Sequence, residues 1–117
     1  MKDRNIAILN KIIKYASEID GTILRFELDF DKFKNDYVAK NAISMCLLQI
    51  GELVNKLSDE FKEKHDKIQW RDIIAIRNRA AHAYGSIDIE ILWNIAINDI
   101  PKLKNYCENI KEVPNVF

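Results

Sequence analysis

Turn-forming residues are scarce in this sequence. Its 117 residues include only three glycines and two prolines, too few for the many tight turns of an all-β fold. The composition therefore predicts an all-α fold. With 48% apolar residues, a chain of this length can bury one core without disulfides or a metal. We expect a single domain over residues 1–117, an antiparallel bundle of four to five helices with a flexible tail from about residue 111.

Net charge, paired cysteines and long apolar runs are also missing. Eighteen basic and eighteen acidic residues cancel, so no strong overall field attracts nucleic acid or an anionic membrane. Cys46 and Cys107 lack paired spacing, which predicts buried or partly buried thiols in a reducing compartment. No apolar run approaches the roughly 20 residues that cross a bilayer, and no signal peptide is visible. These absences predict a cytoplasmic protein without a membrane partner.

The common metal and nucleotide motifs do not occur in the sequence. It has no HExxH, no CxxC pair, no phosphate-binding glycine loop and no EF-hand loop. We therefore expect neither a metal site nor a cofactor. His65 lies in the charged stretch KEKHDK and is expected to be a solvated surface histidine. Trp70 and Trp93 are expected to anchor the core.

Apolar periodicity predicts the helices. The first is expected over residues 3–20, with Gly21 at its end, followed by an irregular or briefly helical connection over residues 22–31. A long central helix is expected from about residue 31 to 64. Its apolar stripe is formed by Ile43, Leu47, Ile50, Val54, Leu57 and Phe61.

Two further helices are expected in the second half of the chain. One runs from Trp70 to about Ala81. The other begins at Asp88, a suitable N-cap, and is kinked or restarted at Pro101.

Two features of the central helix suggest close contacts with other chain segments. Gly51 costs a helix about 1 kcal/mol relative to alanine, a cost that is offset if another backbone approaches closely. The helix is also apolar beyond one narrow stripe, which predicts either a bend or a second copy packed on it as a homodimer. Glu52 and Lys56 lie one helical turn apart, and an exposed ion pair between them is the simplest expectation.

The stretch RNRAAHAYG, residues 77–85, is the candidate functional site. Arg77 is a permanent cation, and His82 is a side chain that titrates near neutral pH. On an ideal helix these two residues are about 140° apart. They can share a site if the helix unwinds near Ala83 and Gly85, or if a two-fold axis brings a second copy opposite. Arg79 is a helix neighbour of His82 and is the second candidate for binding a phosphate.

Three segments together resemble a known family. The order IGELVNKLSDEF, IQWRDIIAIRNRAAHAY and IDIEILWNIAINDIPKL is similar to the HepT-like branch of the HEPN superfamily. Its signature is Arg, four residues, His, one residue and Tyr, which Arg77, His82 and Tyr84 match. The resemblance extends from about Tyr37 to Leu103. Gln69 stands where the family usually has a proline.

The resemblance implies an all-α HEPN bundle that forms a homodimer or higher homo-oligomer, with the signature facing the interface. Such proteins are commonly metal-independent endoribonucleases, often toxins. The chemistry this implies is attack of the RNA 2′-OH on the adjacent phosphate, leaving a 2′,3′-cyclic end. His82 would move a proton and Arg77 would hold the phosphate. Asn78 and Arg79 are secondary catalytic or RNA-binding candidates.

The resemblance also implies a protein partner. HepT-like proteins are typically neutralised by a minimal nucleotidyltransferase antitoxin of the MntA type, which adds AMP to the signature tyrosine, here Tyr84. The alternative to an enzyme is a non-catalytic HEPN dimer that binds the nucleotidyltransferase or RNA without cleaving it. A purely structural helical dimer is a third possibility.

Overall fold

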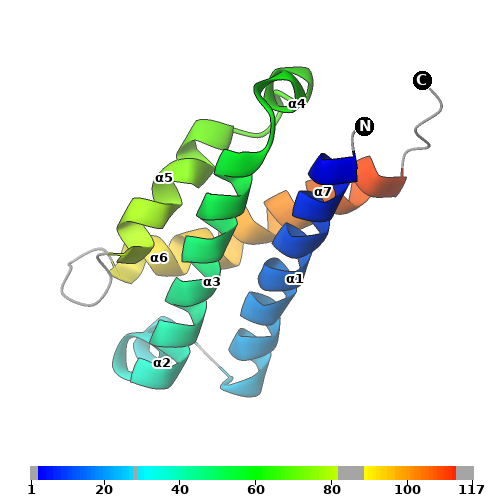
Figure 1. Ribbon diagram of the computed structural model, residues 1–117. Coiled ribbons are helices and arrows are strands. Elements are labelled where there is room, and N and C mark those ends of the chain that lie inside the picture. The colour runs from blue at the N-terminus through cyan, green and yellow to red at the C-terminus, as the bar shows by residue number, and fades with distance from the viewer. Residues whose placement is uncertain (1–2, 28, 82–88, 113–117) are drawn as a thin grey trace.

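All the elements that the structure describes are helical. The computed structural model describes residues 3–27, 29–81 and 89–112. They form α1 (Asp3–Arg25), α2 (Phe30–Asn35), α3 (Tyr37–Lys56), α4 (Asp59–Lys64), α5 (Trp70–Ala81), α6 (Ile89–Asn94), the π-helix η1 (Ile95–Asp99) and α7 (Ile100–Glu112). In Figure 1, α1, α3 and α5 stand side by side with alternating direction, and the rod α6–η1–α7 crosses behind them. The prediction of an all-α antiparallel bundle is confirmed.

The first helix is longer than predicted. The expected stop at Gly21 is wrong, because α1 continues to Arg25. Its apolar face also continues, since Ile19 is buried and Ile23 packs against the core. The residue that leaves the helical conformation is Glu27, with a φ of 50°. This left-handed conformation often terminates helices and usually falls on glycine, so the sequence signal pointed to the wrong residue.

The predicted continuous central helix is also wrong, because α2, α3 and α4 divide it. Asp36 caps α3, its side chain accepting hydrogen bonds from the backbone N–H of Val38 and Ala39 at 3.0 and 3.1 Å. Ser58 caps α4 by accepting one from Phe61 at 3.1 Å. Both residues are typical N-caps, which satisfy N–H groups that a helix start leaves unpaired. Buried apolar residues lie on both sides of each break, Phe33 and Ala39 around the first and Leu57 and Phe61 around the second, so periodicity alone did not reveal the breaks.

The third helix begins at Trp70, as the sequence predicted, and is helical to Ala81, the last described residue of this segment. The predicted cap of the fourth, Asp88, lies outside the described residues. Pro101 does change that helix: the N–H of Ile100 bonds to the carbonyl of Ile95, five residues earlier. A proline ring clashes with the carbonyl four residues before it, and the wider π-turn is a common local adjustment. The helix then continues to Glu112, and the rest of the predicted tail lies outside the described residues.

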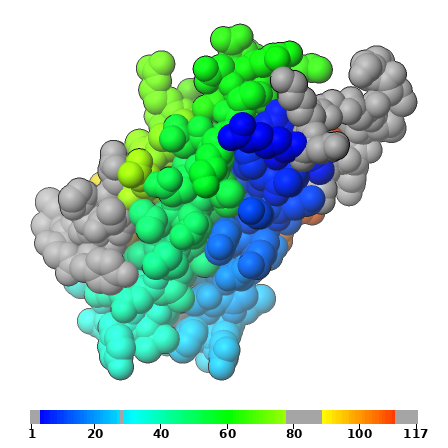
Figure 2. Space-filling model, in the orientation of Figure 1, coloured from blue at the N-terminus to red at the C-terminus, as the bar shows by residue number. Residues whose placement is uncertain are grey.

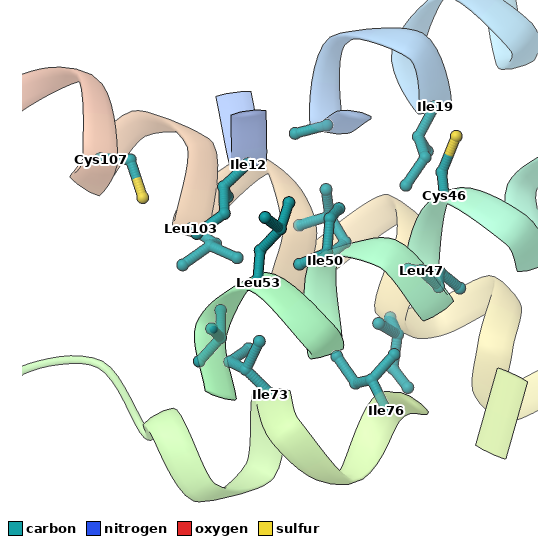
Figure 3. Close-up of a cluster of buried hydrophobic side chains, with 14 of the residues drawn as sticks. Ile12, Ile19, Cys46, Leu47, Ile50, Leu53, Ile73, Ile76, Leu103 and Cys107 are labelled. Atoms are coloured by element: carbon teal, nitrogen blue, oxygen red, sulfur yellow. The ribbon is translucent and has the colours of Figure 1, made fainter. Parts of the chain in front are cut away.

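One core joins the long helices. In Figure 3, Ile12 of α1, Leu47 and Ile50 of α3, Ile73 and Ile76 of α5 and Leu103 of α7 gather in a single cluster. Both tryptophans are buried as predicted, and the ring of Trp93 lies 5.1 Å from that of Phe33. Cys46 and Cys107 are buried free thiols, also as predicted. Burial raises the pKa of Cys46 to about 11 and that of Cys107 to about 12.

His65 stands at the start of the connection into α5, and the expectation of a solvated surface histidine is wrong. Its ring centroid lies 4.4 Å from that of Phe61, and its Nδ1 is 3.5 Å from the Tyr106 hydroxyl. Its carbonyl oxygen accepts a 2.7 Å hydrogen bond from the Trp70 indole N–H. The stretch KEKHDK is polar in sequence, but in the fold its histidine packs in an aromatic cluster with Phe61, Trp70 and Tyr106. This cluster fixes the entry to α5, the helix that carries Arg77.

The environment of His65 predicts a pH dependence of stability. Burial, and secondly the charge of Lys64, lowers the pKa of His65 from 6.5. The unfolded chain therefore binds this proton more readily. The stability that the neutral ring contributes is complete above 6.5 and is lost as the pH falls through the lowered pKa. We expect wild type to lose more stability than His65→Gln between about pH 7.5 and about pH 5.5, measured by urea unfolding. Equal losses in both proteins would contradict this.

Candidate active site

Arg77 lies in α5, one turn before Ala81, the last described residue of that helix. Its guanidinium Nε forms an ion pair with Oε1 of Glu52 on α3. Half of the Arg77 side chain remains exposed, as does 38% of the Glu52 side chain. A guanidinium has five N–H donors, and a single carboxylate binds only some of them. Arg77 can therefore contact a further anion while it stays paired.

Gly51 brings α3 and α5 into backbone contact at this point. A Cβ placed on Gly51 would lie 2.9 Å from Cβ of Arg77 and 3.0 Å from its backbone nitrogen. Real Cβ atoms do not approach this closely, so only glycine fits without a shift of one helix. The expectation that another backbone approaches Gly51 is confirmed. The approaching backbone belongs to the same chain, at the residue predicted to bind phosphate.

The expected ion pair between Glu52 and Lys56 is wrong, since the Glu52 carboxylate turns to Arg77 instead. The two helices pack so closely at Gly51 that a guanidinium from α5 reaches the carboxylate. Sequence reasoning missed Glu52 as part of the site. The available signal was its position next to a helix-interior glycine, where a second helix was already expected.

The other predicted site residues follow Arg77 along the chain. Asn78 and Arg79 lie in the last turns of α5, and the backbone is regular helix up to Ala81. His82 and Tyr84 lie outside the described residues. The predicted meeting of Arg77 with His82, by unwinding of the helix or across a two-fold axis, stays a prediction.

A half-open cleft of about 460 Å³ lies between α5 and the rod α6–η1–α7. Its walls are mainly apolar, with Ile73 and Ile76 on one side and Ile91 and Ile95 on the other. Neither Arg77 nor Glu52 lines this cleft. Arg77 and Glu52 pair outside this cleft, where both side chains stay partly exposed.

Two kinds of feature are absent from residues 3–27, 29–81 and 89–112. None of the helices in these ranges is long and apolar enough to span a bilayer. Within the same ranges, no three His, Cys, Asp or Glu side chains are grouped so that they could hold a metal ion.

Comparison with known proteins gives one consistent result. A family model described as "Ribonuclease HepT-like" matches residues 8–110. The chain is 30% identical over 111 residues to "Putative RNase MJ1380" of Methanocaldococcus jannaschii, covering 92% of this chain and 98% of that protein. It is 33% identical over 86 residues to "Probable ribonuclease HepT" of Thermococcus cleftensis, covering 74% of this chain and 78% of that protein. No solved structure matches the chain significantly.

Proposed function

The chain belongs to the HepT-like ribonuclease family of the HEPN superfamily, and we propose that it is an endoribonuclease in which Arg77 and His82 act together on RNA. The observation that carries the proposal is the position of Arg77. Its side chain is half exposed, and its guanidinium is held at Nε by Glu52. In the family signature, Arg77 stands five residues before His82. The site therefore offers an RNA phosphate an oriented cation on an open surface.

The proposed reaction needs a proton carrier and a cation. The RNA 2′-oxygen loses its proton and attacks the neighbouring phosphorus, the bond to the 5′-oxygen breaks, and that oxygen takes up a proton. The products are a 2′,3′-cyclic phosphate and a 5′-hydroxyl. His82, with a reference pKa of about 6.5, moves one of these protons. Arg77, or its neighbour Arg79, stabilises the negative charge that grows on the phosphate.

In this mechanism the nucleophile comes from the RNA itself, so the proposed cleavage does not depend on a metal. The test is the cleavage of an end-labelled single-stranded RNA by purified wild type in EDTA, with the new ends analysed by mass. Cleavage that survives chelation and leaves cyclic phosphate ends is the expected result. RNA binding without cleavage would instead indicate the alternative, a HEPN dimer that binds RNA or a nucleotidyltransferase.

We also propose that the protein acts as a homodimer or higher homo-oligomer. Val38 and Met45 of α3 are about half exposed, and seven-residue spacing places Val38, Met45 and Glu52 along one face of the helix. Figure 2 shows α3 beside α1 on an open face of the molecule. A second copy packed on Val38 and Met45 would lie on the same face of α3 as Glu52, the partner of Arg77. Its His82 could then supply the second proton transfer, with Asn78 orienting the phosphate.

Met45→Glu is expected to weaken such a dimer, because it places a charge in the proposed apolar contact. The expected result is a shift towards monomer in sedimentation velocity at a fixed protein concentration. Ile97→Glu, a substitution at a residue of similar exposure on η1, is the matched control and should leave the distribution unchanged. Unaltered association of Met45→Glu would contradict the proposed face.

We further propose that this ribonuclease is the toxin of a toxin–antitoxin system in the cytoplasm. An MntA-type nucleotidyltransferase would transfer AMP from ATP to the Tyr84 hydroxyl, with release of pyrophosphate. Tyr84 is two residues from His82, so the added anion would compete with RNA for the arginines and block the site. The AMP group would then occupy the place of the RNA phosphate beside Arg77, Asn78 and Arg79.

Tyr84→Phe tests this setting, because phenylalanine lacks the acceptor hydroxyl. After incubation with the nucleotidyltransferase and ATP, we expect a mass increase of one AMP on wild type and none on Tyr84→Phe. Cleavage by the variant should then persist in the presence of the antitoxin. AMP on the variant would show that another residue is the acceptor.

A further inference from the structure

Helix α3 touches both ends of the Arg77 side chain. At its base, the backbone of Arg77 lies so close to Gly51 that a Cβ on Gly51 would be 2.9 Å from Cβ and 3.0 Å from the backbone nitrogen of Arg77. At its tip, Glu52 pairs with Nε. The two contacts come from consecutive residues. Since adjacent residues of a helix point about 100° apart, one can meet the neighbouring backbone while the next reaches around to the guanidinium.

A half-exposed arginine needs such contacts if it is to be oriented. Free in solvent, its long side chain populates many rotamers, and fixing it costs conformational entropy each time a ligand binds. Contacts already made in the free protein remove part of that cost from the reaction. The pair at Nε also sets the plane of the guanidinium, so its remaining N–H groups have a defined direction.

We propose that Gly51 and Glu52 are positioning residues for Arg77, an inference that rests on the proposed ribonuclease function. Gly51 sets where the side chain starts, and Glu52 sets the orientation of the guanidinium towards the scissile phosphate. Neither residue needs to touch the RNA. Gly51 and Glu52 of α3 thus belong to the functional site through Arg77, which they position, and not through contact with the substrate.

The Glu52 carboxylate also weakens RNA binding, and this makes the inference testable. A negative charge beside Arg77 repels the phosphate that Arg77 binds. A positioning role therefore predicts opposite effects on binding and on cleavage when the charge is removed. Glu52→Gln keeps the shape of the side chain, so RNA should bind more tightly while the bound RNA is cleaved more slowly.

The experiment measures both quantities with single-stranded RNA. Binding is measured by fluorescence anisotropy at several salt concentrations in a His82→Ala background, so that no cleavage interferes. We expect Glu52→Gln to tighten binding about threefold to tenfold and to steepen the salt dependence by about 0.7 in the log–log slope, as for one more effective cation. Single-turnover cleavage, with His82 intact, should slow by about tenfold or more. Glu63→Gln, the same change at an exposed position of α4, is the matched control and should alter neither quantity.

NMR spectroscopy can follow the ion pair between Glu52 and Arg77 directly, without a measurement of activity. In wild type, the Nε–H group of Arg77 should give a resolved NMR signal, assigned by its loss in Arg77→Lys. This signal should broaden or move towards that of a free arginine in Glu52→Gln. Gly51→Ala should slow single-turnover cleavage while leaving the salt slope unchanged, because it displaces the arginine without altering the charge.

The outcomes separate the alternatives. Tighter binding with slower cleavage supports the inference. Tighter binding with unchanged or faster cleavage overturns it, because Glu52 would then only compete with RNA. Weaker binding together with a lowered melting temperature overturns it in favour of a structural role, and results equal to Glu63→Gln also overturn it. If wild type cleaves no RNA at all, the proposed function fails separately, and unchanged binding and an unchanged Arg77 signal in Glu52→Gln would reject the positioning role.

Discussion

Replacing His82 by alanine is expected to slow RNA cleavage by about 10²- to 10⁴-fold, the range typical for loss of a general acid or base. The side chain is proposed to carry a proton in the reaction, and no other residue of the RNRAAHAYG stretch titrates near neutral pH. Arg77→Ala should have an effect of about 10²- to 10³-fold, because the growing phosphate charge loses its oriented donors. Both rates are measured under single-turnover conditions, so that they report the chemical step.

The controls separate chemistry from folding. Arg71 is an exposed arginine of the same helix, and Arg71→Ala should cleave like wild type. Arg77→Lys keeps the charge but loses the planar fork and the Nε that Glu52 binds, so its rate should stay well below wild type. Ion pairs with both partners partly exposed contribute only about 0–1 kcal/mol, so Arg77→Ala should unfold at nearly the wild-type urea concentration. Cleavage by His82→Ala at the wild-type rate would point to a contaminating nuclease.

The same substitution is expected to have opposite effects at Gly51 and at Gly21, which both lie inside helices. Gly51→Ala places a methyl group 2.9 Å from Cβ of Arg77 and 3.0 Å from its backbone nitrogen, so α3 and α5 must separate. Such overpacking typically costs about 1–3 kcal/mol, which outweighs the roughly 1 kcal/mol gained in helix propensity. At Gly21 no atom lies within 4 Å of the added methyl group. Gly21→Ala should therefore stabilise the protein by about 0.5–1 kcal/mol.

Urea unfolding of the two variants beside wild type measures this difference. The unfolding midpoint should fall for Gly51→Ala and rise for Gly21→Ala, with similar slopes if both remain two-state. Each glycine is the control for the other, because the change in side chain and the loss of unfolded-chain entropy are the same. An equal rise in both variants would mean that the contact between Gly51 and Arg77 relaxes at no cost.

The parts of the fold that were predicted correctly depend on local pattern. Few turn residues and a 3.6-residue apolar period are enough to predict an all-α bundle, and the start of α5 was placed correctly at Trp70. The missed boundaries have a common cause. Buried apolar residues continue across Asp36 and Ser58, because the core on which they pack is continuous. Where several conformations bury the same face, the hydrogen bonds of the caps select among them.

The sequence by itself determined the family, the signature residues Arg77, His82 and Tyr84, and the need for a close neighbour at Gly51. These follow from residue identity and spacing, which are properties of the chain. The tertiary structure alone decided that this neighbour is Arg77 and that Glu52 pairs with Arg77 in preference to Lys56. Glu52 lies one turn from Lys56 but 25 residues from Arg77. A contact over that separation depends on how two helices pack, and the packing is set by the whole core.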